Sequence, residues 1–81
     1  MKITGNILII DDEAVLRQTL ARILQQAGFE ATTAENAEQA FIFLRSTTFD
    51  LVYMDLRMPG MHGLEALKYI HEQYPSLPVI L

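Results

Sequence analysis

The stretch Phe49-Asp-Leu-Val-Tyr-Met-Asp55-Leu-Arg-Met-Pro-Gly60 decides how the rest of the chain is interpreted. Residues 51–54 form a short unbroken apolar run, with the length and composition of a strand buried on both faces of a parallel sheet. The run ends at the carboxylate of Asp55, and Met-Pro-Gly at residues 58–60 is typical of a tight turn. Ligands collect at the carboxyl ends of strands in open α/β sheets, so Asp55 is expected at a functional site.

Strands and helices are predicted to alternate along the whole chain. Apolar runs predict further strands at residues 7–10, 29–34 and 78–81, and the second of these has the polar alternation of an edge strand. Apolar residues at helical spacing predict three helices, carrying Leu16, Leu20, Ile23, Leu24 and Ala27; Ala37, Ala40, Phe41 and Leu44; and Leu64, Leu67 and Ile70. Gly28 is placed as a left-handed C-cap, and Asn36 with Gln39 as a capping box. This βαβαβαβ order predicts a doubly wound parallel sheet with strand order 2-1-3-4.

Composition excludes several classes of function. The 81 residues make one small domain, and 51% hydrophobic with 20% charged residues describes a globular chain. A net charge of −4 argues against direct nucleic-acid binding, which needs clustered Lys and Arg. The absence of cysteine excludes disulfides and thiolate metal sites and is compatible with a cytoplasmic location. No apolar run approaches the roughly 20 residues of a membrane span.

Three acids are expected to meet at one edge of the sheet. Asp11 and Asp12 follow the first predicted strand and Asp55 follows the third, and the doubly wound topology places these strands side by side. Three carboxylates within a few ångströms repel one another unless a cation compensates them, and Mg²⁺ or Mn²⁺ accepts such oxygen ligands. The same arrangement would let Asp55 act as a nucleophile toward phosphorus.

Each of these residues also has a simpler interpretation. Asp11 and Asp12 alone would serve equally well as caps of the first helix, and Asp55 alone is more often a turn residue. His62 and His71 lack the spacing of a helical metal pair and are expected at the surface. The joint position of the acids favours a functional site. In a doubly wound sheet such a site is built after the first and the third strand, where the strand order reverses, and acids stand at both places.

The segments Ile7-Leu-Ile-Ile-Asp-Asp-Glu13 and Asp50-Leu-Val-Tyr-Met-Asp-Leu-Arg-Met-Pro-Gly-Met-His-Gly-Leu64 resemble a receiver domain of two-component response regulators. The resemblance implies a flavodoxin-like (CheY-like) fold and a phosphoacceptor signalling domain, which assists its own phosphoryl transfer without being an enzyme. It implies that Asp55 takes a phosphoryl group from a sensor histidine kinase or a phosphotransfer protein. Mg²⁺ would be held by Asp12 directly, by Asp11 through water, by Asp55, and by the backbone carbonyl of Arg57.

The resemblance stops before the end of the family's pattern. Receivers run to roughly 120 residues, a typical size for one domain, so the chain is expected to be a single incomplete receiver domain over residues 1–81. It is either a fragment of a longer regulator, with an output domain missing after it, or a shortened receiver with another purpose. The family's Ser or Thr and its Lys beyond the fourth strand have no counterpart, and Lys68 cannot replace that Lys because it lies within a predicted helix. Phosphorylation is therefore expected to be impaired.

Other functions compete with this interpretation. A haloacid-dehalogenase-type phosphatase would need an acid where Arg57 stands, and flavin or dinucleotide binders would need a phosphate loop where the chain has acids. The serious alternative is a phosphorylation-incompetent module for protein interaction or self-assembly. The fourth strand would be a raw edge beside an uncovered apolar face carrying Val52, Met54, Val79 and Ile80, so a homo-oligomer is expected through them.

Overall fold

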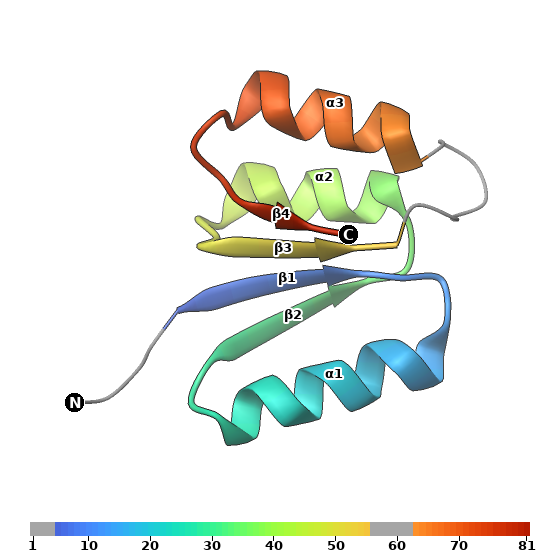
Figure 1. Cartoon of the computed structure of the whole chain (residues 1–81), viewed down its shortest axis with the longest axis vertical. Coiled ribbons are helices and arrows are strands. Elements are labelled where there is room, and N and C mark those ends of the chain that lie inside the picture. The colour runs from blue at the N-terminus through green and yellow to red at the C-terminus, as the bar shows by residue number, and fades with distance from the viewer. Residues whose placement is uncertain (1–4, 56–62) are drawn as a thin grey trace.

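The computed structural model describes residues 5–55 and 63–81, which form alternating strands and helices around one sheet (Figure 1). The elements in chain order are β1 (Asn6–Ile10), α1 (Ala14–Gln26), β2 (Glu30–Ala34), α2 (Ala37–Ser46), β3 (Leu51–Met54), α3 (Gly63–Gln73) and β4 (Val79–Ile80). The sheet is parallel with the order β2-β1-β3-β4. The predicted doubly wound parallel sheet with strand order 2-1-3-4 is therefore confirmed.

The register of the strands brings their carboxyl ends level with one another. Ile10, the last residue of β1, pairs with Ala34 on one side and with Met54 on the other. The residues that directly follow β1 and β3 therefore emerge next to each other at the same edge of the sheet.

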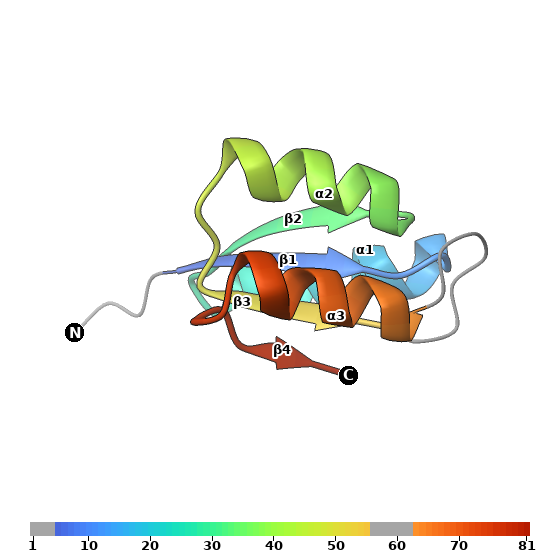
Figure 2. The same cartoon turned by 90° about the horizontal axis from the view of Figure 1, so that it is seen from above.

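The helices cover the two faces of the sheet unequally (Figure 2). One face packs Ile7, Ile9 and Ala21 together, with Leu20 and Leu24 of α1 against them. The other face holds the larger cluster, in which Leu8, Ile10, Ala34, Ala37, Ala40, Leu44, Phe49, Val52, Met54, Ala66 and Ile70 pack beneath α2 and α3. This division follows from right-handed crossovers: the chain steps outward in one direction from β1 to β2 and in the other from β2 to β4, so α1 lies opposite α2 and α3.

Two helix ends form as the sequence predicts. Gly28 has φ 102°, its N–H donates to Gln25 O, and the N–H of Phe29 donates to Leu24 O, which is the pattern of a Schellman motif. At the start of α2, Asn36 Oδ1 accepts a bond of 2.8 Å from the N–H of Gln39. The side chain of Gln39 returns one residue earlier than in an ideal capping box, to the N–H of Glu35.

The prediction that an apolar face of the sheet is uncovered is wrong for most of the residues assigned to that face. Val52 and Met54 are fully buried beneath α2 and α3, and Val79 packs against the same cluster. Of the four residues only Ile80 is exposed, at 51%, and it precedes the exposed Leu81 at the end of β4. The error has a simple cause: α3 connects β3 to β4 (Figure 2), and its Ala66 and Ile70 pack against Val52 and Met54.

Some expectations fall on residues outside the described ranges. These are the tight turn at residues 58–60, the carbonyl of Arg57 and the position of His62. His71 lies exposed on α3, as expected for a surface residue, and Lys68 lies exposed within the same helix.

Candidate functional site

The acidic site is built on the hydrogen-bond ladder of the sheet. The N–H of Asp11 donates to Ala34 O on β2 over 3.1 Å, and the N–H of Asp55 donates to Ile10 O on β1 over 3.0 Å. The parallel pairing therefore continues one residue past the strand ends, and it fixes the backbone from which two of the acids project.

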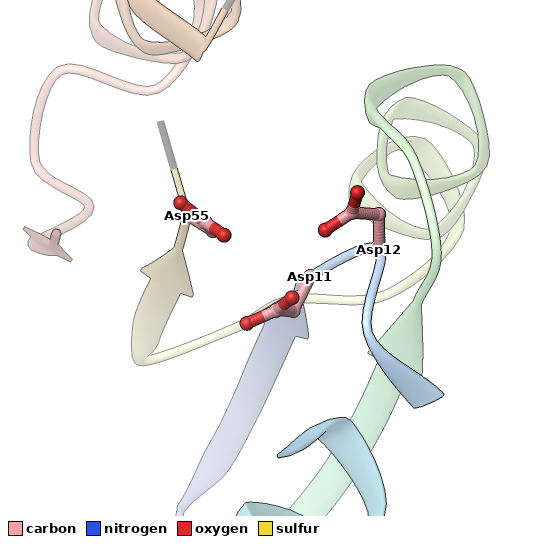
Figure 3. A group of neighbouring side chains, drawn as sticks. All are labelled: Asp11, Asp12 and Asp55. Atoms are coloured by element: carbon pink, nitrogen blue, oxygen red, sulfur yellow. The ribbon is translucent and has the colours of Figure 1, made fainter. Parts of the chain in front are cut away.

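Asp11, Asp12 and Asp55 converge as the sequence predicts. Each offers one carboxylate oxygen, and these three oxygens lie within 4.8 Å of one another. The carboxylates of Asp55 and Asp12 face each other across a gap, with Asp11 at its base (Figure 3). Asp11 is buried at 1% exposure, Asp55 is half-buried and Asp12 is exposed, so the site opens toward solvent on one side.

The buried carboxylate of Asp11 has one satisfied and one unsatisfied oxygen. Oδ1 accepts a bond of 2.9 Å from the N–H of Glu13, whereas Oδ2 is buried and has no hydrogen-bond partner among the described residues. A buried anionic oxygen without a partner is costly, because it has lost its hydration and gained nothing in return. A cation at this edge of the sheet would remove that cost.

The donor set fits a hard divalent cation. All three side chains offer carboxylate oxygens, which Mg²⁺ and Mn²⁺ accept and which soft metals do not prefer. The open side toward Asp12 leaves room for the water molecules that Mg²⁺ usually retains. Three negative charges this close together would also attract such an ion with an electrostatic energy larger than the thermal energy.

The simpler capping interpretation accounts for only part of the arrangement. The N-cap of α1 is Glu13, with no side-chain hydrogen bond to the helix. Asp11 bonds the N–H of Glu13 itself, in the turn before the helix. Its second oxygen stays out of any capping bond, so helix capping leaves the convergence with Asp12 and Asp55 unexplained.

One contact of the acidic turn is not predicted by the sequence pattern. Arg17 Nη1 donates a hydrogen bond of 2.8 Å to the backbone carbonyl of Asp11. The only signal in the sequence is a basic residue one turn into the helix that follows an acidic pair, and such a residue is more often simply solvated.

Two further features lie away from the acids. A hollow of about 390 Å³ lies between the loops that lead into β3 and β4, at the opposite end of the sheet, and its lining includes Leu44, Thr48, Tyr74 and Leu77. In the part of the chain that the structure describes, no helix has both the length and the apolar character that a membrane crossing requires.

Comparison with known proteins agrees with this geometry. The sequence profile of the response regulator receiver domain matches residues 7–81. The DNA-binding transcriptional regulator NtrC of Salmonella typhimurium is 43% identical over 77 residues, which are 95% of this chain and 16% of NtrC. The chain thus spans only a small part of that relative's length.

Solved structures give the same assignment. The response regulator TrrA of Thermotoga maritima, in complex with Mg²⁺-BeF, matches with a TM-score of 0.89 and 41% identity, covering 100% of this chain and 68% of that one. A complex of the histidine kinase ThkA with TrrA matches with a TM-score of 0.86 and 39% identity, covering 98% and 66%. The matching sequence profile, the similar relatives and the sheet topology together show that the chain belongs to the response regulator receiver domains of two-component signalling.

Proposed function

We propose that this receiver takes a phosphoryl group onto Asp55 from a sensor histidine kinase or a phosphotransfer protein, with Mg²⁺ or Mn²⁺ held by Asp11, Asp12 and Asp55. The observation that carries the proposal is the convergence of three carboxylates, with one oxygen of each within 4.8 Å of the others. One of the three also has a buried oxygen that lacks a partner among the described residues. The TrrA structure with Mg²⁺-BeF adds support by similarity. Arg57, whose backbone carbonyl we propose as a further ligand, lies outside the described residues.

The chemistry assigned to Asp55 is a single displacement at phosphorus. A carboxylate oxygen of Asp55 attacks the phosphorus of a phosphohistidine, a P–O bond forms, and the P–N bond breaks with its electron pair left on the imidazole nitrogen. The backbone bond from the N–H of Asp55 to Ile10 O holds the strand end that presents this oxygen. Bound Mg²⁺ would supply charge compensation for the phosphoryl oxygens.

The partner is proposed to dock beside the acids. Val15 near the start of α1 is 76% exposed and Leu64 near the start of α3 is 67% exposed, and both helices begin at the end of the sheet where β1 and β3 lead to Asp11 and Asp55 (Figure 1). Exposed apolar side chains next to a site are typical of a protein-binding surface. The ThkA–TrrA complex shows a kinase bound to a similar receiver.

The wider role is that of one module in a cytoplasmic phosphorelay. NtrC, which is described as DNA-binding, is much longer than the region of similarity. We place any such output function in a domain outside these residues, because the net charge of −4 disfavours direct contact with nucleic acid.

Labelling with a small acyl phosphate tests the proposal. The protein is incubated with acetyl phosphate and MgCl₂, and the covalent adduct is measured by intact mass and located by peptide mapping. We expect the adduct on Asp55 and its loss in Asp55→Asn or when EDTA replaces the metal. Asp50→Asn is the control, since Asp50 is an exposed carboxylate at the opposite end of β3 and should not affect labelling. A label that survives in Asp55→Asn would refute the assignment.

A second function is favoured by the exposed end of the sheet. Ile80 and Leu81 are 51% and 55% exposed, and β4 pairs only with β3 among the described strands. The alternative is therefore a phosphorylation-incompetent module that self-associates through β4 into a homo-oligomer. Sedimentation equilibrium with and without the Ile80→Ser change tests it. A monomer at every concentration, together with efficient labelling of Asp55, would exclude this alternative.

A further inference from the structure

In the described part of the chain, one cationic side chain links the turn that carries the acids to α1. Arg17 Nη1 donates to the carbonyl of Asp11 over 2.8 Å, and Arg17 is half-buried in the first turns of the helix. Asp11 is thereby held at three points: its N–H by Ala34, its Oδ1 by Glu13, and its carbonyl by Arg17.

These three bonds leave Oδ2 as the one polar atom of Asp11 with no partner among the described residues. They also fix both neighbours of Asp12, because the N–H of Glu13 is bound to Asp11 Oδ1. The exposed carboxylate of Asp12 therefore projects from a backbone that is clamped on each side, and it faces Asp55 across the gap (Figure 3).

We propose that Arg17 is a positioning residue of the acidic site, which sets the orientation of Asp11 and Asp12 for the cation without touching the cation or the phosphoryl group. The proposal rests on the metal site described under the proposed function. A charge-assisted bond to a backbone carbonyl suits this task, since it is stronger and more directional than a neutral one. The N-cap of α1 provides no side-chain bond that could take its place.

The charge of Arg17 and its hydrogen bond act on metal affinity in opposite directions. A cation next to the site repels Mg²⁺, so loss of the charge alone would tighten binding. Loss of the hydrogen bond frees the turn and weakens binding, because the ligands must then be ordered when the metal arrives. The sign of the change in the dissociation constant therefore separates the two effects.

The experiment measures Mg²⁺ binding to the 81-residue protein by NMR titration at constant ionic strength. Arg17→Met keeps the apolar part of the side chain and removes the donors. Arg22→Met is the matched control, since it removes the same charge from an exposed position of the same helix. We expect the Mg²⁺ dissociation constant to rise roughly tenfold in Arg17→Met, at the lower end of the usual cost of losing a group that orients a metal ligand. In Arg22→Met we expect no change or slightly tighter binding.

Two additional measurements separate positioning from a general loss of stability. Arg17→Lys keeps the positive charge and N–H donors at the end of a long side chain, and it should restore most of the affinity. Amide exchange without metal should accelerate at Glu13 in Arg17→Met, while the amide of Asp55, bound to Ile10 O, keeps its protection. If Arg17→Met does not fold, Arg17→Gln replaces it, because its shorter side chain keeps the polarity but not the reach.

The possible failures are distinguishable. If Mg²⁺ binds the wild-type protein and is lost in Asp12→Asn, but Arg17→Met binds as tightly as Arg22→Met, the role of Arg17 is overturned and the metal site stands. Unchanged exchange at Glu13 would overturn it equally. A wild-type protein that binds no Mg²⁺ would refute the metal site and this inference together.

Discussion

Replacing Asp11 by Asn should make the metal-free protein more stable. The amide oxygen of Asn can still accept the N–H of Glu13, which Asp11 Oδ1 now does over 2.9 Å. An NH₂ group then takes the position of Oδ2, the buried oxygen that has no partner within residues 5–55 and 63–81. The substitution therefore removes an uncompensated buried charge and provides donors that face the carboxylates of Asp12 and Asp55.

The gain follows from the distances in the cluster. Two unit charges separated by the 4.8 Å that bounds the three oxygens repel by about 1 kcal/mol at the dielectric constant of water and by about 3.5 kcal/mol at an effective value of 20. Asp12 is exposed, so its repulsion of Asp11 is near the lower value, and half-buried Asp55 lies between the two. We expect about 3 kcal/mol more stability in total, which corresponds to an increase in Tm of about 15 °C for a domain of this size.

Urea unfolding followed by circular dichroism measures this difference. In EDTA, Asp11→Asn should have the larger free energy of unfolding. In MgCl₂ the wild-type protein should gain about 1.4 kcal/mol when free Mg²⁺ is tenfold above its dissociation constant, and the variant should gain much less. Glu72→Gln is the control, because it removes one exposed negative charge from the far end of α3. If Asp11→Asn is less stable than wild type in EDTA, the charge-repulsion argument is wrong.

Three smaller predictions concern the scaffold, and thermal or urea unfolding checks each one. Ile70→Ala removes a fully buried side chain and should cost about 2 to 5 kcal/mol, whereas Ile42→Ala, at a position 58% exposed, should cost under about 0.5 kcal/mol; equal losses would contradict the assigned core. Gly28→Ala forces a side chain into φ 102° and should cost about 1 kcal/mol or more, and a stabilised variant would exclude the left-handed cap. Asn36→Ala removes the bond to the N–H of Gln39 and should cost about 1 kcal/mol, so an unchanged Tm would show that this cap contributes nothing.

The sequence predicts the fold and the site because both depend on pattern. Apolar runs that end in acids identify the strands, and the rule for parallel sheets then places Asp11 beside Asp55 without any knowledge of side-chain contacts. The expectation of an uncovered apolar face is wrong for a different reason. Val52 and Met54 alternate with Leu51 and Tyr53, which shows that the pairs lie on opposite faces, but only the path of α3 decides which face is covered.

Individual side-chain bonds leave no such pattern. The reach of Arg17 back to the carbonyl of Asp11 depends on one rotamer, and many arginines in the same position of a helix are merely solvated. The choice of which Asp11 oxygen is bound and which is left alone is likewise set by the local turn, through the N–H of Glu13. Neither choice changes the periodicity or the composition of the sequence.

The placement of β1 between β2 and β3 affects the order in which the molecule assembles. β1, α1 and β2 are consecutive and form a local unit, whereas the contact of β1 with β3 closes a long loop, as the bond between Asn6 and Asp50, 44 residues apart, illustrates. Loop-closure entropy disfavours such contacts early in folding. We therefore expect Asp55 to meet Asp11 and Asp12 late in the folding reaction, so that repulsion within the cluster speeds unfolding more than it slows folding. A cation bound at this site would therefore lower the unfolding rate, which lengthens the lifetime of the native state, without raising the folding rate.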